Sequence, residues 1–251
     1  MRQRAIFLDL DGTIAAGNRP PSESDTAAIR RARAAGHRVF LCTGRAPSYI
    51  YDSVLEVGFD GIVGAAGGYI RLGGEVVYRR PLSAGQLRRA IEIYQAGGKR
   101  VYLEGEENMY TLHAPPSERR WPPVDGPADF EPGGRFAGQN VLKITAYGPV
   151  GGERRLLEPE MDIIDHGDYA EILPAGVCKS DGMRRVLELI GIPREDSIAL
   201  GDSRNDLDML RYAGVGVAMG GAPDVVVQAA DRVTGSLEEN GAASALAALL
   251  G

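Results

Sequence analysis

Residues 5–14, AIFLDLDGTI, join a buried strand to two acidic side chains and decide how the rest of the chain is interpreted. Four apolar residues run into Asp9 and Asp11, which are separated by one residue. Residues two apart in an extended chain point to the same face, so we expect both carboxylates to project together from the strand end. At about 5 Å and an effective dielectric constant near 20, two such charges repel by about 3 kcal/mol. This repulsion raises the pKa of one carboxyl group unless a cation lies between the two.

The first 80 residues alternate short apolar runs with helical patterns, which is typical of a parallel α/β sheet. We expect strands over residues 5–10, 38–43 and 61–66. A helix is predicted from the N-cap Ser22 to residue 35, where Gly36 ends it, and a second helix over about 47–57. Residues 69–79 read as a hairpin with Gly73 and Gly74 in the turn.

The pattern changes in the middle of the chain and returns after residue 174. A helix over 83–97, a hairpin over 100–113 and strands over 140–147, 161–166 and 169–173 indicate an α+β insertion. A Pro- and Gly-rich loop over 114–135 contains Trp121, for which packing on the cap is favoured over contact with substrate. Helices over 180–190, 205–211 and 241–250, with strands over 197–202 and 214–219, resume the alternation. The sequence predicts a split core, residues 1–81 and 175–251, with an inserted cap over 82–174.

Composition excludes several classes of protein. The chain has 251 residues, 44% of them hydrophobic, and a formal net charge of −6, so it carries no basic footprint for nucleic acid or an anionic membrane. The apolar run at the N-terminus is too short for a signal peptide, and no run approaches membrane-spanning length, so we expect a cytoplasmic protein. Cys42 and Cys178 have no metal-ligand spacing, which disfavours a structural zinc site; a single bridge between them stays open.

Basic residues are almost all arginine, and Lys99, Lys143 and Lys179 are the three lysines. Each lysine therefore stands where an arginine would be the default choice for this chain.

Polar clusters follow several of the predicted core strands. In an open α/β sheet, ligands bind beyond the carboxyl ends of the strands. We therefore expect the side chains that follow these strands to line one crevice: Asp9, Asp11, Thr43, Asp202 and Asp206. Lys179 is expected to join them from the start of a helix. Taken singly, Asp202 and Asp206 could merely cap a helix, and Lys179 could be a solvated residue. Their joint occurrence, in order and at element ends, favours the site.

These motifs, taken in order, resemble those of a known family. Asp9-Leu10-Asp11-Gly12-Thr13, Thr43-Gly44-Arg45, Lys179 and Gly201-Asp202-Ser203-Arg204-Asn205-Asp206 are similar to the four ordered motifs of haloacid dehalogenase superfamily phosphatases. Residues 214–246 resemble the Cof-type branch, which carries a large α/β cap between the second and third motifs. The resemblance implies a Rossmann-like three-layer core with a mostly parallel sheet, plus an inserted α+β cap that sets substrate specificity.

The sequence departs from the Cof-type pattern in two places. Near the third strand Ala66-Gly67-Gly68 stands where the branch usually has Asn-Gly-Ala, and the tail has Met219-Gly220-Gly221-Ala222 in place of Met-Gly-Asn-Ala. Two amide side chains that contact phosphate or orient its neighbours are therefore missing. These departures bear on substrate contacts, because the acids and the lysine of the motifs are intact.

The resemblance also implies roles for individual residues. Asp9 would be the nucleophile that forms an aspartyl-phosphate, and Asp11 the general acid and then the general base. Thr43 and Lys179 would bind the equatorial phosphoryl oxygens.

The metal and the remaining contacts follow from the same resemblance. Mg²⁺ would be held by a carboxylate oxygen of Asp9, the main-chain carbonyl of Asp11, and Asp202, with Asp206 ligating directly or through water. This expectation requires the carboxyl groups of Asp9 and Asp202 to lie close enough to share one ion. Backbone N–H groups and side chains for phosphate or substrate would come from four further residues: Gly12, Gly44, Arg45 and Asn205. For Arg45, pairing with a surface acid stays equally open.

These observations predict a Mg²⁺-dependent phosphomonoester hydrolase of small phosphorylated metabolites, with sugar phosphates as the first candidate class. Within the superfamily, the presence of Asp11 disfavours dehalogenases and ion-pumping ATPases, which lack an Asp at that position. A phosphomutase of the same fold remains an alternative, and so does a catalytically silent phosphometabolite-binding protein. The partner is expected to be a small molecule, and oligomeric state stays open.

Overall fold

The structure is a computed structural model that describes residues 2–118, 120–158 and 160–251. The chain forms two compact units. The first comprises Met1–Gly44, Ile50–Tyr78 and Cys178–Gly251, and the second Arg45–Tyr49 and Arg79–Val177. These junctions lie three residues from the boundaries at 81 and 175 that the sequence suggested. The short segment Arg45–Tyr49, which we expected in the core, groups instead with the second unit.

An eight-stranded sheet runs through the first unit in the order β13-β12-β11-β1-β2-β3-β4-β5. Neighbouring strands from β13 to β3 are parallel, and β3 pairs with β4 in the antiparallel sense. The mostly parallel core sheet is therefore confirmed. Its strands are β1 (Ala5–Leu8), β2 (Arg38–Cys42), β3 (Gly61–Gly64), β4 (Tyr69–Leu72), β5 (Glu75–Arg79), β11 (Ser197–Gly201), β12 (Val215–Ala218) and β13 (Arg232–Val233).

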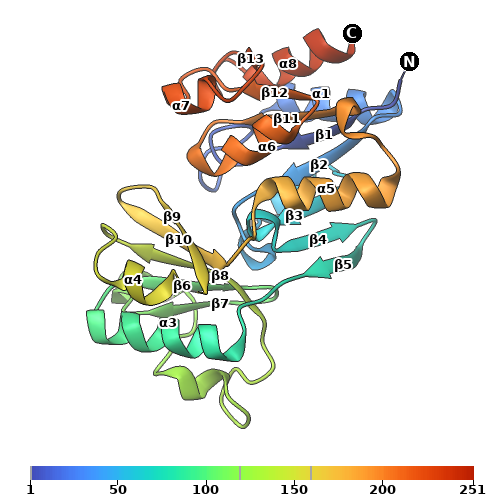
Figure 1. The fold of residues 1–251 in the computed structure, drawn as a ribbon. Coiled ribbons are helices and arrows are strands. Elements are labelled where there is room, and N and C mark those ends of the chain that lie inside the picture. The colour runs from blue at the N-terminus through green and yellow to red at the C-terminus, as the bar shows by residue number, and fades with distance from the viewer. Residues whose placement is uncertain (1, 119, 159) are drawn as a thin grey trace. The chain divides into compact units, whose positions relative to one another are not determined.

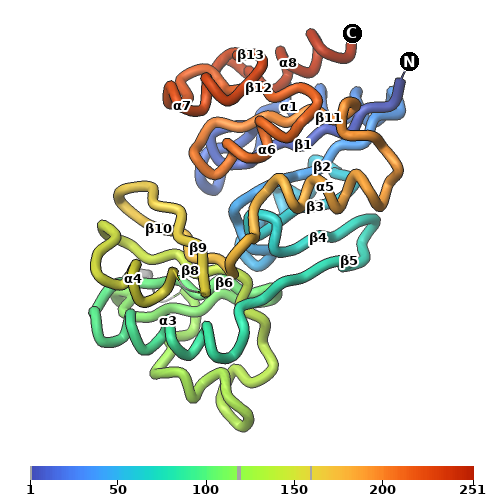
Figure 2. Tube along the Cα trace, in the orientation of Figure 1, coloured from blue at the N-terminus to red at the C-terminus, as the bar shows by residue number. Residues whose placement is uncertain are grey.

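Helices cover both faces of this sheet (Figure 1). Alternation along β1 sends Ile6 and Leu8 into the core cluster of one face and Phe7 into the cluster of the other. The first cluster is shared with α1 (Glu23–Ala34), α2 (Asp52–Leu55) and α8 (Gly241–Leu250). The second is shared with α5 (Lys179–Ile190), α6 (Leu207–Tyr212) and α7 (Asp224–Val227). Strands β1 and β11, far apart in the sequence, lie side by side (Figure 2).

Local signals explain where the elements begin and end. Ser22 caps α1, and its side chain accepts a hydrogen bond from the N–H of Asp25 at 3.0 Å, as predicted. The continuous helix predicted over 47–57 is wrong. A 3₁₀ turn over Pro47–Tyr49 and the four-residue α2 take its place, because the chain passes between the two units at this point. The short elements α7 and β13 carry no periodic pattern and were not predicted.

The second unit is built on a five-stranded antiparallel sheet in the order β7-β6-β8-β10-β9, which confirms the α+β character of the insertion. Its strands are β6 (Val101–Gly105), β7 (Met109–Leu112), β8 (Val141–Tyr147), β9 (Met161–Asp165) and β10 (Tyr169–Pro174). Helices α3 (Ala84–Gly97) and α4 (Glu153–Leu157) pack with this sheet around an apolar core.

The loop predicted over 114–135 contains 3₁₀ turns over Pro116–Glu118 and Pro127–Phe130; residue 119 lies outside the described residues. Trp121 packs edge-to-face against Tyr49 and Tyr102, with ring centroids 5.8 and 5.2 Å away. The expectation of a packing role for this residue is confirmed. Among the helices of the described residues, none has the length and apolar character needed to cross a bilayer.

Candidate active site

The predicted acids lie just beyond the carboxyl ends of adjacent parallel strands. Asp9 follows β1 and Asp202 follows β11, and the N–H of Asp9 donates to the carbonyl of Leu200 at 3.0 Å, which continues the pairing of the two strands. Thr43 follows β2 and is buried, and its N–H donates to the carbonyl of Val63 at 2.8 Å. Parallel pairing brings these three strand ends to one edge of the sheet, where the open α/β architecture places ligands.

Three carboxylates gather at this edge. Asp9, Asp202 and Asp206 each contribute one oxygen to a group in which all three atoms lie within 4.8 Å of one another. Asp9 is 4% exposed and Asp206 is fully buried. Asp9 and Asp202 are therefore near enough to share a single ion, as the sequence interpretation required.

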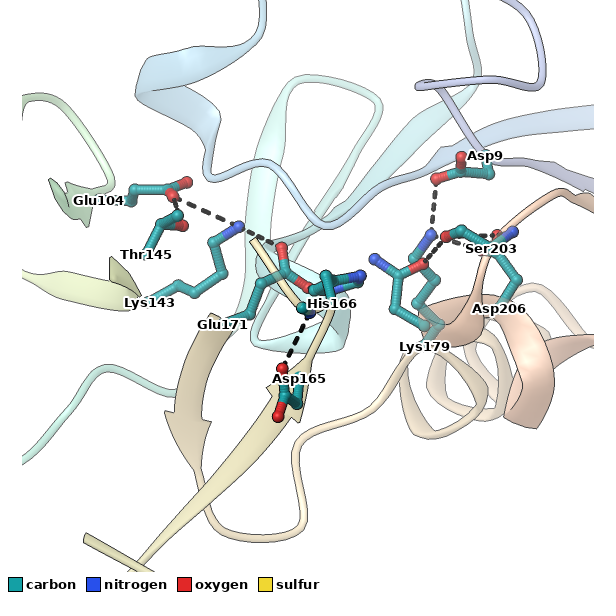
Figure 3. Close-up of polar contacts among 12 residues, drawn as sticks. Asp9, Glu104, Lys143, Thr145, Asp165, His166, Glu171, Lys179, Ser203 and Asp206 are labelled. Atoms are coloured by element: carbon teal, nitrogen blue, oxygen red, sulfur yellow. Dashed lines mark hydrogen bonds and ion pairs between the residues drawn. The ribbon is translucent and has the colours of Figure 1, made fainter. Parts of the chain in front are cut away.

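Lys179 supplies positive charge to this group from the first residue of α5. Its side chain is fully buried, and Nζ donates to Oδ1 of Asp9 and to Oδ1 of Asp206, at 2.6 Å in each case (Figure 3). Burial alone would lower the pKa of Lys179, but the charges of Asp206 and Asp9 outweigh it and raise the pKa well above its ordinary value. Lys179 therefore stays cationic and joins two of the three carboxylates.

The cluster remains short of positive charge despite Lys179. Burial, followed by the neighbouring charge of Asp206, raises the pKa of Asp9 well above its ordinary value. Burial and Asp206 likewise raise the pKa of Asp202 to about 6. Three carboxylates against one ammonium leave a net charge of −2, which a divalent cation would neutralise. Closely spaced carboxylate oxygens are also the ligands that Mg²⁺ prefers, so the residues present fit a divalent metal site.

The second acid of the opening stretch does not lie where strand geometry suggested. Strand β1 ends at Leu8, so the alternation breaks before Asp11, and Asp11 is exposed while Asp9 is buried. The acid that crowds Asp9 is Asp206. The backbone of Asp11 instead pairs with that of Ala15 as an isolated β-bridge in the turn that follows. The charge of Asp11 is one of those that raise the pKa of Asp202.

Gly12 is required by close packing against Asp202. Its backbone has a φ of +86°, and a Cβ atom at this position would lie 2.2 Å from Oδ2 of Asp202. The predicted use of its N–H toward phosphate needs correction, because that group donates to the carbonyl of Ala15 at 2.8 Å. The buried Thr13 was quoted in the motif without a role; its hydroxyl donates to Oδ1 of Asp202 at 3.3 Å.

Asp206 organises the loop after β11. The helix predicted over 205–211 begins later, because residues Arg204–Asp206 form a 3₁₀ turn. Oδ2 of Asp206 accepts the N–H groups of Asp202 and Ser203 at 3.0 Å each, while Oδ1 accepts from Lys179. Asn205 holds its side-chain oxygen 2.8 Å from the hydroxyl of Ser203. Both oxygens of Asp206 are thus engaged in holding the site together.

The loop that carries the second motif is divided between the units. Thr43 and the buried Gly44 belong to the first unit, whereas Arg45 groups with the second. There Nη1 of Arg45 donates to the carbonyl of Tyr49 at 3.3 Å, and its guanidinium lies over the Tyr49 ring. The phosphate contact expected for Arg45 stays a prediction.

A strained turn adjoins Thr43. The carbonyl of Thr43 accepts the N–H of Ala66 at 3.0 Å, and both Ala65 and Ala66 adopt left-handed backbone conformations, with φ of 47° and 51°. Ala66 occupies the position at which the family pattern has Asn, a residue that tolerates this conformation better than alanine. Left-handed non-glycine residues are found preferentially at functional sites.

A second buried charge cluster lies in the second unit. Glu104 and residues 166–171 were possible cap contacts from the sequence, but their gathering around Lys143 was not predicted. Nζ of Lys143 donates to Oε1 of Glu171 at 2.6 Å and lies 3.3 Å from Oε1 of Glu104, and Nε2 of His166 is 3.3 Å from Glu171 (Figure 3). Burial alone would raise the pKa of Glu171, but the charge of Lys143 and the hydrogen bonds from His166 and Lys143 together hold the pKa far below its ordinary value. The scarcity of lysine in the sequence was the signal that could have located this cluster, because two of the three lysines, Lys143 and Lys179, are buried among carboxylates.

The two cysteines do not form the bridge that the sequence left open. Cys42 is buried at the end of β2, Cys178 immediately precedes Lys179, and both are free. Burial raises the pKa of both thiols, so they are protonated at neutral pH.

The chain is similar to known proteins over most of its length. A family model described as haloacid dehalogenase-like hydrolase matches residues 6–133 and 157–246. The chain is 28% identical to the 5-amino-6-(5-phospho-D-ribitylamino)uracil phosphatase YitU of Bacillus subtilis (strain 168), over 95% of this chain and 94% of that protein. It is also 28% identical to a phosphoglycolate phosphatase of Methanothermobacter thermautotrophicus, over 99% of each chain.

A solved structure shows the same likeness along the whole chain. The subclass IIB sugar phosphatase BT4131 is 25% identical and superposes with a TM-score of 0.85, over 98% of each chain. The chain belongs to the haloacid dehalogenase-like hydrolase family, and its fold is that of the subclass IIB, or Cof-type, phosphatases. It is a phosphatase of this type.

Proposed function

We propose that this phosphatase hydrolyses phosphate monoesters of small metabolites through an aspartyl-phosphate on Asp9, with Mg²⁺ bound beside it. The observation that carries the proposal is the buried contact of Lys179 with both Asp9 and Asp206, next to Asp202. A binding protein gains nothing from crowding three carboxylates around one lysine, because their repulsion destabilises the fold. A phosphoryl-transfer site needs this combination of nucleophile, cation and metal ligands.

In the first half of the reaction, a carboxylate oxygen of Asp9 attacks phosphorus as the bond to the alcohol oxygen breaks. Asp11, which is exposed, donates a proton to the departing alcohol. In the second half, Asp11 removes a proton from water, the water oxygen bonds to phosphorus, and the carboxylate of Asp9 is regenerated as phosphate leaves. Lys179 balances the negative charge on the phosphoryl oxygens, with Thr43 as a further donor.

The metal would be held by carboxylate oxygens of Asp9 and Asp202 and by the main-chain carbonyl of Asp11, with Asp206 acting through the hydrogen bonds that fix the loop. When bound, Mg²⁺ supplies a positive charge that neutralises the cluster and stabilises the phosphoryl group in the transition state. Gly44 and Asn205 are proposed to line the phosphate side of the site.

We infer the substrate class from the relatives. The proteins named above are a 5-amino-6-(5-phospho-D-ribitylamino)uracil phosphatase, a phosphoglycolate phosphatase and a sugar phosphatase. The compounds that these names imply share a phosphate monoester on a small polar alcohol. We propose sugar phosphates as the first class to test, and the second unit, inserted between Thr43 and Lys179, as the part that selects among them.

Phosphate release tests the proposal. The wild-type protein is incubated with p-nitrophenyl phosphate and with a panel of sugar and organic-acid phosphates, in Mg²⁺ and in EDTA. We expect release of inorganic phosphate that requires Mg²⁺ and that falls by at least about 10³-fold in Asp9→Asn, since loss of a nucleophile leaves only residual catalysis. Equal release by wild type and Asp9→Asn would contradict the proposal.

The same panel separates the alternatives. Conversion of a sugar phosphate to its isomer with little free phosphate would identify a phosphomutase. Saturable binding of a phosphorylated metabolite without turnover would identify a silent binding protein.

A further inference from the structure

The N-terminus of α5 lacks the capping contact that such a helix normally has. The first N–H groups of a helix have no partner inside it, and a side chain at the N-cap position usually accepts one of them. In α5 the N-cap residue is Cys178, and its side chain makes no such hydrogen bond. Lys179 is the first helical residue, so the direction of its side chain depends on how this unsupported turn is held.

The missing acceptor comes from another element. Oδ2 of Asp208, in the first turn of α6, accepts the N–H of Ser180 at 2.6 Å. A carboxylate bound to a backbone N–H forms a charge-assisted hydrogen bond, and negative charge at a helix N-terminus is favourable. Asp208 therefore caps α5 from outside the helix.

A second contact holds the other side of the same turn. A Cβ atom on Gly67 would lie 2.1 Å from the carbonyl oxygen of Cys178, and one on Gly182 would lie 2.4 Å from Cγ1 of Val63. The start of α5 is thus pressed against the turn that follows β3. Packing fixes its distance from the sheet, and the hydrogen bond to Asp208 joins it to α6.

The position of Asp208 links the two halves of the site. It lies two residues beyond Asp206, which accepts from Nζ of Lys179. The segment that carries Asp202 and Asp206 is thereby tied to α5 twice, once through the lysine side chain and once through the helix backbone. Loss of the hydrogen bond between Asp208 and the N–H of Ser180 would shift the backbone of Lys179, although Asp208 contacts none of the reacting groups among the described residues.

We propose that Asp208 is a positioning residue of the phosphatase, which acts through the N-terminus of α5 to hold Nζ of Lys179 between Asp9 and Asp206. This inference rests on the proposed function, because the effect of misplacing Lys179 is read from phosphoryl transfer. The relevant property of Asp208 is an acceptor oxygen at a fixed place. An asparagine retains such an oxygen, whereas an alanine does not.

The test compares Asp208→Ala, Asp208→Asn and the control Ser22→Ala, which removes the N-cap of α1 in the same unit. Losing a cap lowers the Tm of Asp208→Ala and of Ser22→Ala by about 2–4 °C. Well below these Tm values, we expect kcat for p-nitrophenyl phosphate to fall about 10- to 100-fold in Asp208→Ala, with weaker inhibition by orthovanadate. Asp208→Asn should stay within about threefold of wild type, and Ser22→Ala should match wild type.

A readout without turnover keeps this inference separate from the proposed function. Amide hydrogen exchange at Ser180, followed by NMR, should be slow in wild type and Asp208→Asn and faster in Asp208→Ala. A wild-type protein that releases no phosphate would defeat the proposed function, while the exchange measurement would still test the cap. Unchanged kcat and vanadate inhibition in Asp208→Ala, an equal loss in Ser22→Ala, or an Asp208→Asn variant as impaired as Asp208→Ala would each overturn the inference.

Discussion

The acidic cluster should make the metal-free protein less stable than a variant that lacks one of its charges. In Asp202→Asn, one carboxylate of the group around Lys179 is replaced by an amide of the same shape. Burial and Asp206 raise the pKa of Asp202 from 3.8 to about 6. At about 1.4 kcal/mol per pH unit, this difference lowers the free energy of unfolding by up to about 3 kcal/mol above pH 6. The variant should regain most of this amount in EDTA at pH 7.

The sign of the pH dependence follows from the raised pKa. An acid that is harder to ionise in the folded state binds more protons there than in the unfolded state between about pH 4 and pH 6. Its unfavourable contribution is therefore absent below pH 4 and complete above pH 6. Urea unfolding in EDTA at pH 7 and pH 4 should show the variant more stable at pH 7 and the difference largely gone at pH 4. Added Mg²⁺ should stabilise wild type more than the variant, and phosphatase activity of the variant should be lost.

A matched control is Asp52→Asn, which neutralises an exposed acid at the start of α2 in the same unit. Its free energy of unfolding should change by less than about 0.5 kcal/mol, as for other surface substitutions. If Asp202→Asn is no more stable than wild type in EDTA at pH 7, or if its advantage persists at pH 4, the reasoning about like-charge crowding is wrong.

Three further predictions concern packing and charge. Lys143→Met leaves the buried carboxylates of Glu104 and Glu171 without their cation, and urea titrations should show a free energy of unfolding lower by about 3–5 kcal/mol. The control Lys99→Met breaks a more exposed ion pair and should lower the free energy of unfolding by about 1 kcal/mol or less. Gly12→Ala places a methyl group against Asp202 and should reduce kcat/KM at least about 100-fold, while Gly17→Ala, with open space around it, should retain activity. Ala66→Gly removes the Cβ atom that makes a left-handed backbone unfavourable, so it should raise the free energy of unfolding by about 0.5 kcal/mol. A lower free energy of unfolding in this variant would show that the backbone of Ala66 is not strained.

Much of the architecture followed from short-range signals. Apolar runs ending in polar residues located the core strands, and Ser22 and Gly36 bounded α1. Because parallel strands end at one edge of a sheet, the order of the motifs was enough to expect Asp9 and Asp202 together, and their oxygens do lie within 4.8 Å. Long-range convergence was predictable here because it is a property of the topology.

What escaped prediction depended on where each chain segment turns. Two acids separated by one residue suggested a shared face, but β1 ends before Asp11, and Asp206 takes the place beside Asp9. The helix expected after Arg45 is broken because that segment groups with the second unit. The cluster around Lys143 has no local pattern, since its members come from three strands that are distant in sequence. Such contacts are set by sheet register, which periodicity alone does not fix.

The claim that Asp9 forms a covalent bond to phosphorus is tested most directly by trapping it. In Asp11→Asn the leaving group p-nitrophenol needs no general acid, but the second step lacks its base, so the phosphorylated enzyme should accumulate. Acid quenching within the first turnover, followed by mass spectrometry of the peptide that contains Asp9, should show the mass of one added phosphoryl group on that residue. Release of p-nitrophenol by this variant, with no phosphoryl group on Asp9 at any quench time, would contradict the account.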